Sequence, residues 1–198
     1  MLLAHASPPL VRILKAFNCY SNNVFHPLSE VIGGAAVVEA IARESVPASV
    51  REGIVIDNAA GAGTTNRLSP RAAVELVHAL EQELRRHGLG LSDVLPVAGI
   101  DVGTLHDRLD DATTRGAVVG KTGTYGSVGA SALAGVVWTR RWGHVTFAIL
   151  NRDVPVPQAR ARQDAFVRAV VADAGSRPLA YRLDPVPTMA AAQLAVGH

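Results

Sequence analysis

Apolar residues recur at helical spacing in four stretches of this chain, and each stretch predicts an amphipathic helix. The first covers residues 10–17, the second residues 28–41, the third residues 70–88 and the fourth about residues 157–174. Ser69 is expected to cap the third helix, because a serine hydroxyl accepts a hydrogen bond from an unpaired backbone N–H and a proline follows it. The apolar face of the fourth helix is predicted to consist of Ala165, Phe166, Ala169 and Val170.

Three runs rich in strand-forming residues follow one another near residues 117–124, 131–139 and 144–151. Turns at residues 126–129 and 141–143 connect them. Such short connections join antiparallel neighbours, since parallel strands need a long crossover. The sequence therefore predicts an α/β fold of the α+β kind, with an antiparallel sheet flanked by helices.

The segments between these elements have weaker patterns. Residues 54–56 predict a strand or a buried extended piece, and residues 58–68 predict a loop rich in Gly, Ala and Thr. Residues 92–116 are expected to be irregular, with a short helix near residues 104–109. The tail, residues 176–198, contains three prolines and is expected to be mobile.

Composition narrows the classes of function. The 198 residues are 48% hydrophobic, which predicts one domain with a sizeable core, assigned here to residues 1–175. The net charge of +2 is scattered along the chain and does not predict a nucleic-acid-binding face. Cys19, the single cysteine, is predicted to be a buried thiol, and the seven histidines lack metal-ligand spacing. No apolar run has membrane-spanning length, so no membrane span is expected. We also expect no metal and no other cofactor.

The use of lysine singles out one position. Of the 19 Lys and Arg residues, only Lys15 and Lys121 are lysines. Lys121 lies in a strand-like run and is followed directly by Thr122, Gly123 and Thr124. A lysine ammonium can lose its proton when it is desolvated, whereas a guanidinium in practice cannot. Lys121 is therefore a candidate for proton transfer or for binding an anion.

Two glycine-rich patterns are similar to nucleotide-binding loops but depart from the required spacing. Gly116-x-x-x-Gly120-Lys121-Thr122 has three residues between its glycines where the phosphate loop has four, and a strand end rather than a helix is predicted after it. Gly61-Ala62-Gly63 has Asn66 at the position of the third glycine of a dinucleotide fingerprint. Nucleotide binding through Lys121 remains the less favoured alternative.

Ser21-x-Asn23 lies at a predicted helix junction, upstream of Lys121-Thr122-Gly123 on a predicted strand. Each tripeptide alone is weak evidence, because Ser and Asn often cap helices and a glycine often follows a strand. In this order and in these settings they resemble the second and third signatures of penicillin-binding, serine-type D-alanyl-D-alanine peptidases.

Neighbouring segments narrow the resemblance to the carboxypeptidase/endopeptidase family called peptidase S13, over roughly residues 5–175. The segments that carry it are Tyr20-Ser21-Asn22-Asn23, Asn66-Arg67-Leu68-Ser69-Pro70, Leu95-Pro96-Val97-Ala98-Gly99-Ile100-Asp101, Gly103-Thr104-Leu105, Gly120-Lys121-Thr122-Gly123-Thr124 and Ser131-Ala132-Leu133-Ala134-Gly135. The resemblance implies part of a penicillin-binding or serine β-lactamase-like transpeptidase fold. It also implies peptidoglycan D-Ala-D-Ala peptides and β-lactams as ligands.

The resemblance also implies roles for the matching residues in acyl transfer, which needs a nucleophile, a proton route and an oxyanion hole. Ser21 and Lys121 would relay a proton as catalytic residues. Asn23 would bind the substrate's amide carbonyl, and Thr122 and Thr124 would hold its terminal carboxylate. Gly123 would let the substrate backbone approach the strand edge, as an added strand does.

The sequence departs from the family at the nucleophile, which should lie in Ser-x-x-Lys. Three residues before Lys15 is Arg12, and three before Lys121 is Val118, so the chain contains no such motif. The family's Asp-Gly-Ser-Gly-Leu-Ser loop is also altered, to Asn-Ala-Ala-Gly-Ala-Gly over residues 58–63. We therefore expect the C-terminal part of an S13-like enzyme, without the first strands and the Ser-x-x-Lys helix, that is inactive on its own.

Two further expectations follow from the resemblance. Without the first strands, the strand over residues 144–151 would have an unpaired apolar edge that favours self-association. The family acts outside the cytoplasmic membrane, whereas residues 1–9 lack the basic region of a signal peptide, so an export sequence is expected upstream or not at all. A non-catalytic module that binds peptidoglycan peptides remains the main alternative function.

Overall fold

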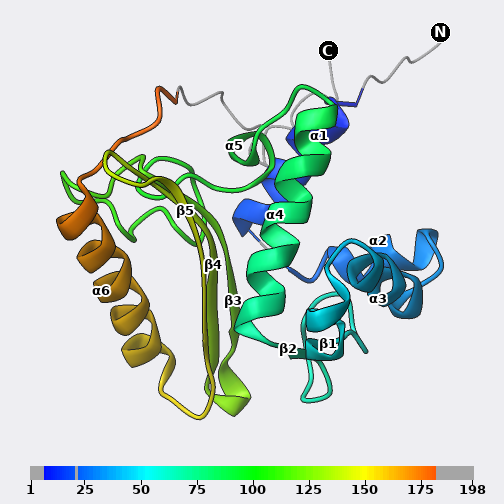
Figure 1. Cartoon of the computed structure of the whole chain (residues 1–198). Helices are drawn as coiled ribbons and strands as arrows, with labels where there is room; N and C mark the ends of the chain where they lie inside the picture. The colour runs from blue at the N-terminus through cyan, green and yellow to red at the C-terminus, as the bar shows by residue number, and fades with distance from the viewer. Residues whose placement is uncertain (1–6, 21, 182–198) are drawn as a thin grey trace, which may run out of the picture.

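The computed structural model describes residues 7–20 and 22–181, and Figure 1 shows the arrangement of their elements. The helices are α1 (Leu10–Tyr20), α2 (Phe25–Val31), α3 (Ala35–Glu44), α4 (Pro70–Arg86), α5 (Leu91–Val94) and α6 (Val156–Ala174), with 3-10 turns at Ala48–Gly53 and Gly126–Val128. The strands are β1 (Ile54–Val55), β2 (Arg67–Leu68), β3 (Val118–Tyr125), β4 (Ala130–Thr139) and β5 (Gly143–Asn151).

The main sheet is antiparallel, with strand order β3-β4-β5. Its three strands confirm the three predicted from the sequence. The helix α6 covers one face of the sheet, and α4 lies on the other (Figure 1). In the described part of the chain, β5 pairs only with β4, so β5 is an edge strand as expected. Self-association through that edge stays a prediction.

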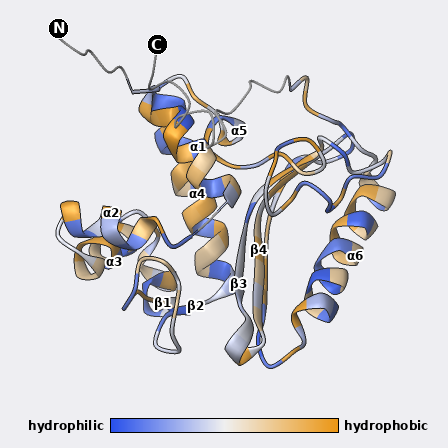
Figure 2. Cartoon of the chain, turned by 180° about the vertical axis from the view of Figure 1, so that it is seen from behind, coloured by the Kyte–Doolittle hydropathy of each residue, from blue (hydrophilic) through white to orange (hydrophobic). Residues whose placement is uncertain are grey.

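Both faces of the sheet are buried, which explains the nearly continuous apolar runs of its strands. Val118, Leu133 and Val137 pack with Val167 and Val171 of α6. On the opposite face, Val119 of β3 and Val136 of β4 pack against the end of α4, against α5 and against the segment that follows α5. The buried residues contributed by these three parts are Leu84, Leu91, Val94, Leu95 and Val97. In Figure 2 the hydrophobic colour runs along β4 between the two layers of helices.

The helix α4 begins as predicted. Ser69 is its N-cap, and the Ser69 hydroxyl accepts a hydrogen bond from the Ala72 N–H at 3.1 Å. Pro70 occupies the first helical position, where its missing N–H has no consequence. The short strand β1 confirms the extended piece predicted at residues 54–56, and it pairs with β2 just before this cap.

The single helix predicted over residues 28–41 is wrong. The chain forms α2 and α3, which meet at an angle of 87°. Gly33 and Gly34 separate them with φ values of 109° and 84°, a region that favours glycine and cannot continue a right-handed helix. Periodicity detected the apolar residues on both sides of this break but not the change of direction.

The predicted apolar face of α6 is largely wrong, since only Val170 of its four residues packs against the core. The buried residues of this helix are Ala159, Gln163, Val167, Val171 and Ala174, whereas Phe166 is 51% exposed. Gln163 is fully buried because its amide hydrogen-bonds to Ser131 and Asn151 of the sheet. Because the polar Gln163 lies in the middle of the buried face, the pattern of hydrophobic residues in the sequence did not identify that face.

Residues 92–116 are largely irregular, as expected, but the short helix predicted at residues 104–109 is wrong. Residues 104–107 form turns and residues 108–109 a bend, and a helix occurs instead at α5. Leu105 and Leu109 are fully buried in the core beside α6. These two leucines are four residues apart, which is the spacing of residues on one face of a helix, and this explains the wrong prediction.

Residues 176–181, which we assigned to the tail, contact the domain, and the rest of that segment lies outside the described residues. Ser176 forms a bridge with Thr139, and the Leu179 N–H donates to the Gly116 carbonyl at 2.9 Å. The Tyr181 hydroxyl donates to Asp101 at 2.8 Å. These contacts extend the fold beyond residue 175.

In the described part of the chain, no single helix is long and apolar enough to cross a membrane. The bent pair of α2 and α3 meets the same test of length and composition when its two helices are taken together.

A buried ion pair joins α1 to the rest of the domain. The Lys15 side chain is 6% exposed and forms a salt bridge with Asp101, which is 1% exposed. The Lys15 ammonium also donates to the carbonyl oxygens of Ser92, at 2.9 Å, and Leu95. Asp101 additionally accepts the Val97 N–H at 2.7 Å, so both charges are hydrogen-bonded as buried charges must be.

We predict that Lys15→Met lowers the free energy of unfolding by about 3–5 kcal/mol, because it leaves the Asp101 carboxylate buried without its cation. Chemical denaturation monitored by circular dichroism measures this loss. The exposed Arg162→Gln serves as a control for removing one positive charge, and it should leave the midpoint unchanged. Equal midpoints for the two variants would contradict a structural role for the Lys15–Asp101 pair.

Candidate active site

A cleft of about 1100 Å³ lies along β3. Lys121, Thr122, Gly123 and Thr124 line it, and so does Asn23 from the turn after α1. The structure therefore brings five of the six predicted site residues to one cleft. Ser21, the sixth, lies outside the described residues, although its neighbours Tyr20 and Asn22 also line the cleft.

The outer edge of β3 is occupied along only half of its length. The Ala98 N–H donates to the Val118 carbonyl at 2.9 Å, and the Gly120 N–H donates to the Pro96 carbonyl at 3.1 Å. Because backbone direction alternates along a strand, the N–H and C=O groups of Thr122 and Thr124 point to the same side as those of Gly120. Among the described residues, no backbone group pairs with that second half, so it is open to the cleft.

Lys121 is a partly buried lysine at this open edge. Its ammonium donates to the Thr122 carbonyl at 2.8 Å. Burial lowers the pKa of Lys121 from 10.5 to about 8, because desolvation disfavours the charged form. The ammonium is thus mostly charged at neutral pH, yet it can lose its proton far more readily than an exposed lysine.

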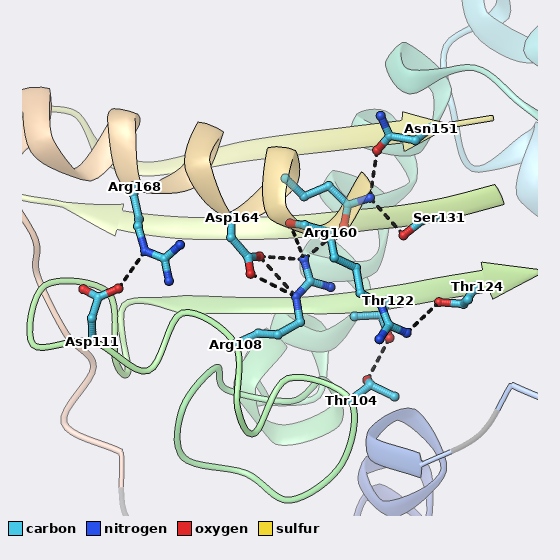
Figure 3. A network of polar contacts seen from close by, with 11 residues as sticks. Thr104, Arg108, Asp111, Thr122, Thr124, Ser131, Asn151, Arg160, Asp164 and Arg168 are labelled. Carbon is cyan, nitrogen blue, oxygen red and sulfur yellow. Dashed lines mark hydrogen bonds and ion pairs between the residues drawn. The ribbon is translucent and has the colours of Figure 1, made fainter. Parts of the chain in front are cut away.

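The two threonine side chains are held by different partners. Thr122 is buried, and its hydroxyl donates to the Thr104 hydroxyl at 2.7 Å. The Thr124 hydroxyl is on the exposed end of the strand and accepts a hydrogen bond from Arg160 of α6 at 3.2 Å. Figure 3 shows both contacts. Neither Thr104 nor Arg160 was selected as a site residue from the sequence, because their partners are 18 and 36 positions away.

The end of α1 is fixed by a close backbone contact. The Cys19 carbonyl accepts the Thr104 N–H at 3.1 Å. Gly103 has φ 101°, and a Cβ atom there would overlap the Cys19 carbonyl oxygen. Cys19 is fully buried as predicted, and burial raises the pKa of its thiol to about 11, which makes it a poor nucleophile at neutral pH. This contact sets where the chain ends α1, just before the turn that contains Asn22 and Asn23.

The altered loop at residues 58–63 forms one rim of the cleft and is held by Asn66. The Asn66 side-chain oxygen accepts the N–H groups of Asp57 and Asn58 at 2.8 and 2.9 Å, and its amide donates to the Asn58 carbonyl at 2.7 Å. The loop therefore has a defined conformation without the polar side chains of the family's loop.

The position of Lys121 argues against a phosphate-binding loop. Lys121 lies inside β3, and the strand continues to Tyr125. A phosphate loop needs its lysine at the start of a helix, where free N–H groups surround the phosphate. Gly61 and Gly63 likewise lie in the rim loop, and α4 does not begin until Pro70. In the described ranges, no group of three or more His, Cys, Asp or Glu side chains could hold a metal ion.

A sequence comparison decides the family. The model of the D-Ala-D-Ala carboxypeptidase 3 (S13) family matches residues 1–173. The chain belongs to the peptidase S13 family. This confirms the resemblance based on the ordered motifs, and the match covers nearly the range expected from them. No protein of curated function matches the chain.

Solved structures agree with this S13 assignment. The predatory endopeptidase Bd0816 of Bdellovibrio bacteriovorus, solved with the immunity protein Bd3460, has 28% identity and a TM-score of 0.77 over 89% of this chain and 47% of its own. The penicillin G-acylated endopeptidase Bd3459 of the same organism has 25% identity and a TM-score of 0.76, over 90% and 50%. Penicillin binding protein 4 from Haemophilus influenzae shares the fold, with 20% identity, a TM-score of 0.69 and coverage of 87% and 41%.

This S13 chain spans about half the length of the solved structures it matches. The comparisons confirm the predicted class of fold, a mixed arrangement of helices and antiparallel sheet similar to penicillin-binding peptidases. They relate the chain to peptidases, while the roles of its individual residues remain predictions.

We predict that Gly103→Ala disrupts the cleft of this S13 chain much more than an alanine at another glycine with positive φ. Gly143 is the matched control, since it has φ 70° and nothing within 4 Å of an added Cβ. Gly143→Ala should cost about 1 kcal/mol of folding free energy from backbone strain. Gly103→Ala should cost at least about 2 kcal/mol more, because the methyl group overlaps α1. Urea denaturation measures both, and equal losses would contradict the contact at Cys19.

Proposed function

We propose that the cleft along β3 binds the D-Ala-D-Ala end of a peptidoglycan stem peptide, as part of a serine-type D-Ala-D-Ala carboxypeptidase or endopeptidase. The open second half of β3, beside Lys121, carries this proposal. An extended peptide can add to such an edge through backbone hydrogen bonds, and its side chains and termini then meet the residues around the edge. Family membership supports the same class of ligand.

The five described site residues supply complementary groups for such a peptide. Thr122 and Thr124 present backbone groups toward an added strand, and the Thr124 N–H is available to a carbonyl oxygen. Gly123 carries no side chain that would obstruct the approach. Asn23 also lines the cleft, from the turn after α1. The Lys121 ammonium provides a positive charge for the terminal carboxylate.

Covalent chemistry needs a further group. An acyl-enzyme forms when a nucleophile with an adjacent base attacks the peptide carbonyl. These 198 residues contain no Ser-x-x-Lys, since Arg12 and Val118 occupy the positions three before the two lysines. We therefore infer that Ser21 and Lys121 move protons for a nucleophile that this chain does not supply. The 198-residue chain alone should bind peptide without hydrolysing it.

We predict that penicillin G leaves the mass of the purified chain unchanged, because the sequence contains no Ser-x-x-Lys in which a lysine activates a serine to open the β-lactam ring. The result can be compared directly with the endopeptidase Bd3459, which is similar to this chain and was solved with penicillin G bound as an acyl group. Intact-mass spectrometry after incubation with excess penicillin G measures the outcome. A covalent adduct would overturn the inference that the chain is inactive alone.

Calorimetric titration with an acetylated peptide ending in D-Ala-D-Ala should show saturable binding, and absence of binding would overturn the proposed ligand.

We predict that this binding weakens as the pH rises above about 8, because the charged form of Lys121 binds the carboxylate and its pKa in the free protein is about 8. An ordinary exposed lysine would keep its charge until about pH 10. Titrations at pH 7 and pH 9.5 test this, with Lys121→Arg as control, since a guanidinium stays charged over the whole range. The arginine variant should lose the pH dependence, and Lys121→Ala should bind weakly at both pH values. An unchanged affinity of the original chain at pH 9.5 would contradict the role of Lys121.

A further inference from the structure

The charged residues that line the cleft all have the same sign. Arg67, Lys121, Arg152 and Arg160 line it, and none of its described lining residues is Asp or Glu. The whole chain has 17 acidic residues against 19 basic ones, so this excess is local to the cleft. Opposite charges on ligand and site raise both encounter rate and specificity. The cleft therefore has more positive charge than Lys121 alone provides, which suits it to an anionic ligand.

Arg160 is, beside Lys121, a second positive charge in direct contact with the open edge of β3. It lies near the start of α6, and its guanidinium donates to the Thr124 hydroxyl at 3.2 Å (Figure 3). That bond uses one of the N–H groups of an exposed guanidinium, and among the described residues the others have no hydrogen-bond partner, so they can bind a ligand. The Arg160 side chain thus extends from α6 to Thr124, which is predicted to hold the C-terminal carboxylate of the ligand.

Asp164 would be the ordinary partner of Arg160, because residues four apart on a helix face each other. Asp164 instead pairs with Arg108, whose guanidinium approaches its carboxylate at 2.6 and 3.1 Å. Arg108 also donates to Gln163 at 3.0 Å. Arg108 thereby occupies the nearest carboxylate on the helix, and the Arg160 guanidinium is directed to Thr124.

The same network holds the start of α6 against the sheet. Gln163 donates to the side-chain oxygens of Ser131 and Asn151 at 3.2 and 2.9 Å. Figure 3 shows Ser131 and Asn151 on the sheet beside this end of the helix, together with the contact of Arg160 with Thr124. Fixing the helix in this way fixes the base of the Arg160 side chain. A preorganised guanidinium loses less conformational freedom when it binds a ligand.

We propose that Arg160 is a specificity-determining residue, whose guanidinium binds the C-terminal carboxylate of the peptide together with Thr124. The inference rests on the proposed function and extends it, because it adds to Lys121 a second cation, outside the predicted motifs, that recognises the free carboxylate. A guanidinium fits a carboxylate through two parallel hydrogen bonds, which a single ammonium cannot provide. The cleft therefore selects peptides with a free C-terminus over amidated or extended ones.

Two peptides and three variants test this selection. The peptides are an acetylated peptide ending in D-Ala-D-Ala and the same peptide with a C-terminal amide. Arg160→Gln should weaken binding of the acid about tenfold and change binding of the amide less than about twofold, since only the acid offers a carboxylate. Arg160→Lys should recover part of the loss, because it restores the charge without the planar pair of donors. Arg162→Gln removes the same charge from the same helix outside the cleft, and it should bind both peptides as the original chain does.

The outcomes separate this inference from the proposed function. If the original chain binds neither peptide, the proposed function is wrong and the inference falls with it. If the original chain binds the acid and Arg160→Gln binds it equally well, peptide binding stands and the role of Arg160 is overturned. If Arg160→Gln lost equal affinity for the acid and for the amide, the role of Arg160 would also be overturned, since the substitution would then act on the structure of the cleft and not on the carboxylate. Thermal melting of the variants provides the check that each is folded.

Discussion

The buried salt bridge between Lys15 and Asp101 is the interaction on which the arrangement of this domain depends. It connects α1 to the segment that contains α5 and residues 96–98, and that segment is the one that pairs with the first half of β3. The Tyr181 hydroxyl donates to the same carboxylate, so the end of the described chain is tied to it as well. Because a buried charge without a partner costs several kcal/mol, these segments must meet in one arrangement. That arrangement brings the turn after α1 to the open half of β3.

The two lysines of the chain show how environment assigns different roles to one side chain. Lys15 is enclosed by a carboxylate and two carbonyl oxygens, and its charge stabilises the packing of α1. Lys121 pairs with no carboxylate among the described residues, and burial lowers its pKa to about 8. The first is suited to hold structure together. The second is suited to bind an anion or to exchange a proton, as lysines at functional sites do.

The cleft combines the motifs that predicted the S13 family with contacts that only the structure shows. The family model matches residues 1–173, which include the Ser-x-Asn and Lys-Thr-Gly motifs, and the neighbouring structures contain endopeptidases and a penicillin-binding protein. The hydrogen bonds of Asn66 to the rim loop and of Arg160 to Thr124 are contacts of the second kind. Loops and helix ends differ more readily than the sheet that supports them, so specificity is expected to depend on these positions.

The sequence by itself determined the three strands of the sheet, the start of α4 at Ser69 and the residues that meet in the cleft. These follow from local patterns: strand-forming runs with short turns, a cap followed by proline, and motifs in a fixed order. Only the tertiary structure decided that α2 and α3 are separate helices, that Gln163 rather than Phe166 faces the sheet, and that Arg160 reaches Thr124. Each of these depends on contacts between residues far apart in the chain, where burial and hydrogen bonding outweigh local hydrophobic periodicity. A pattern along the chain identifies which residues can pack, but packing itself selects which of them do.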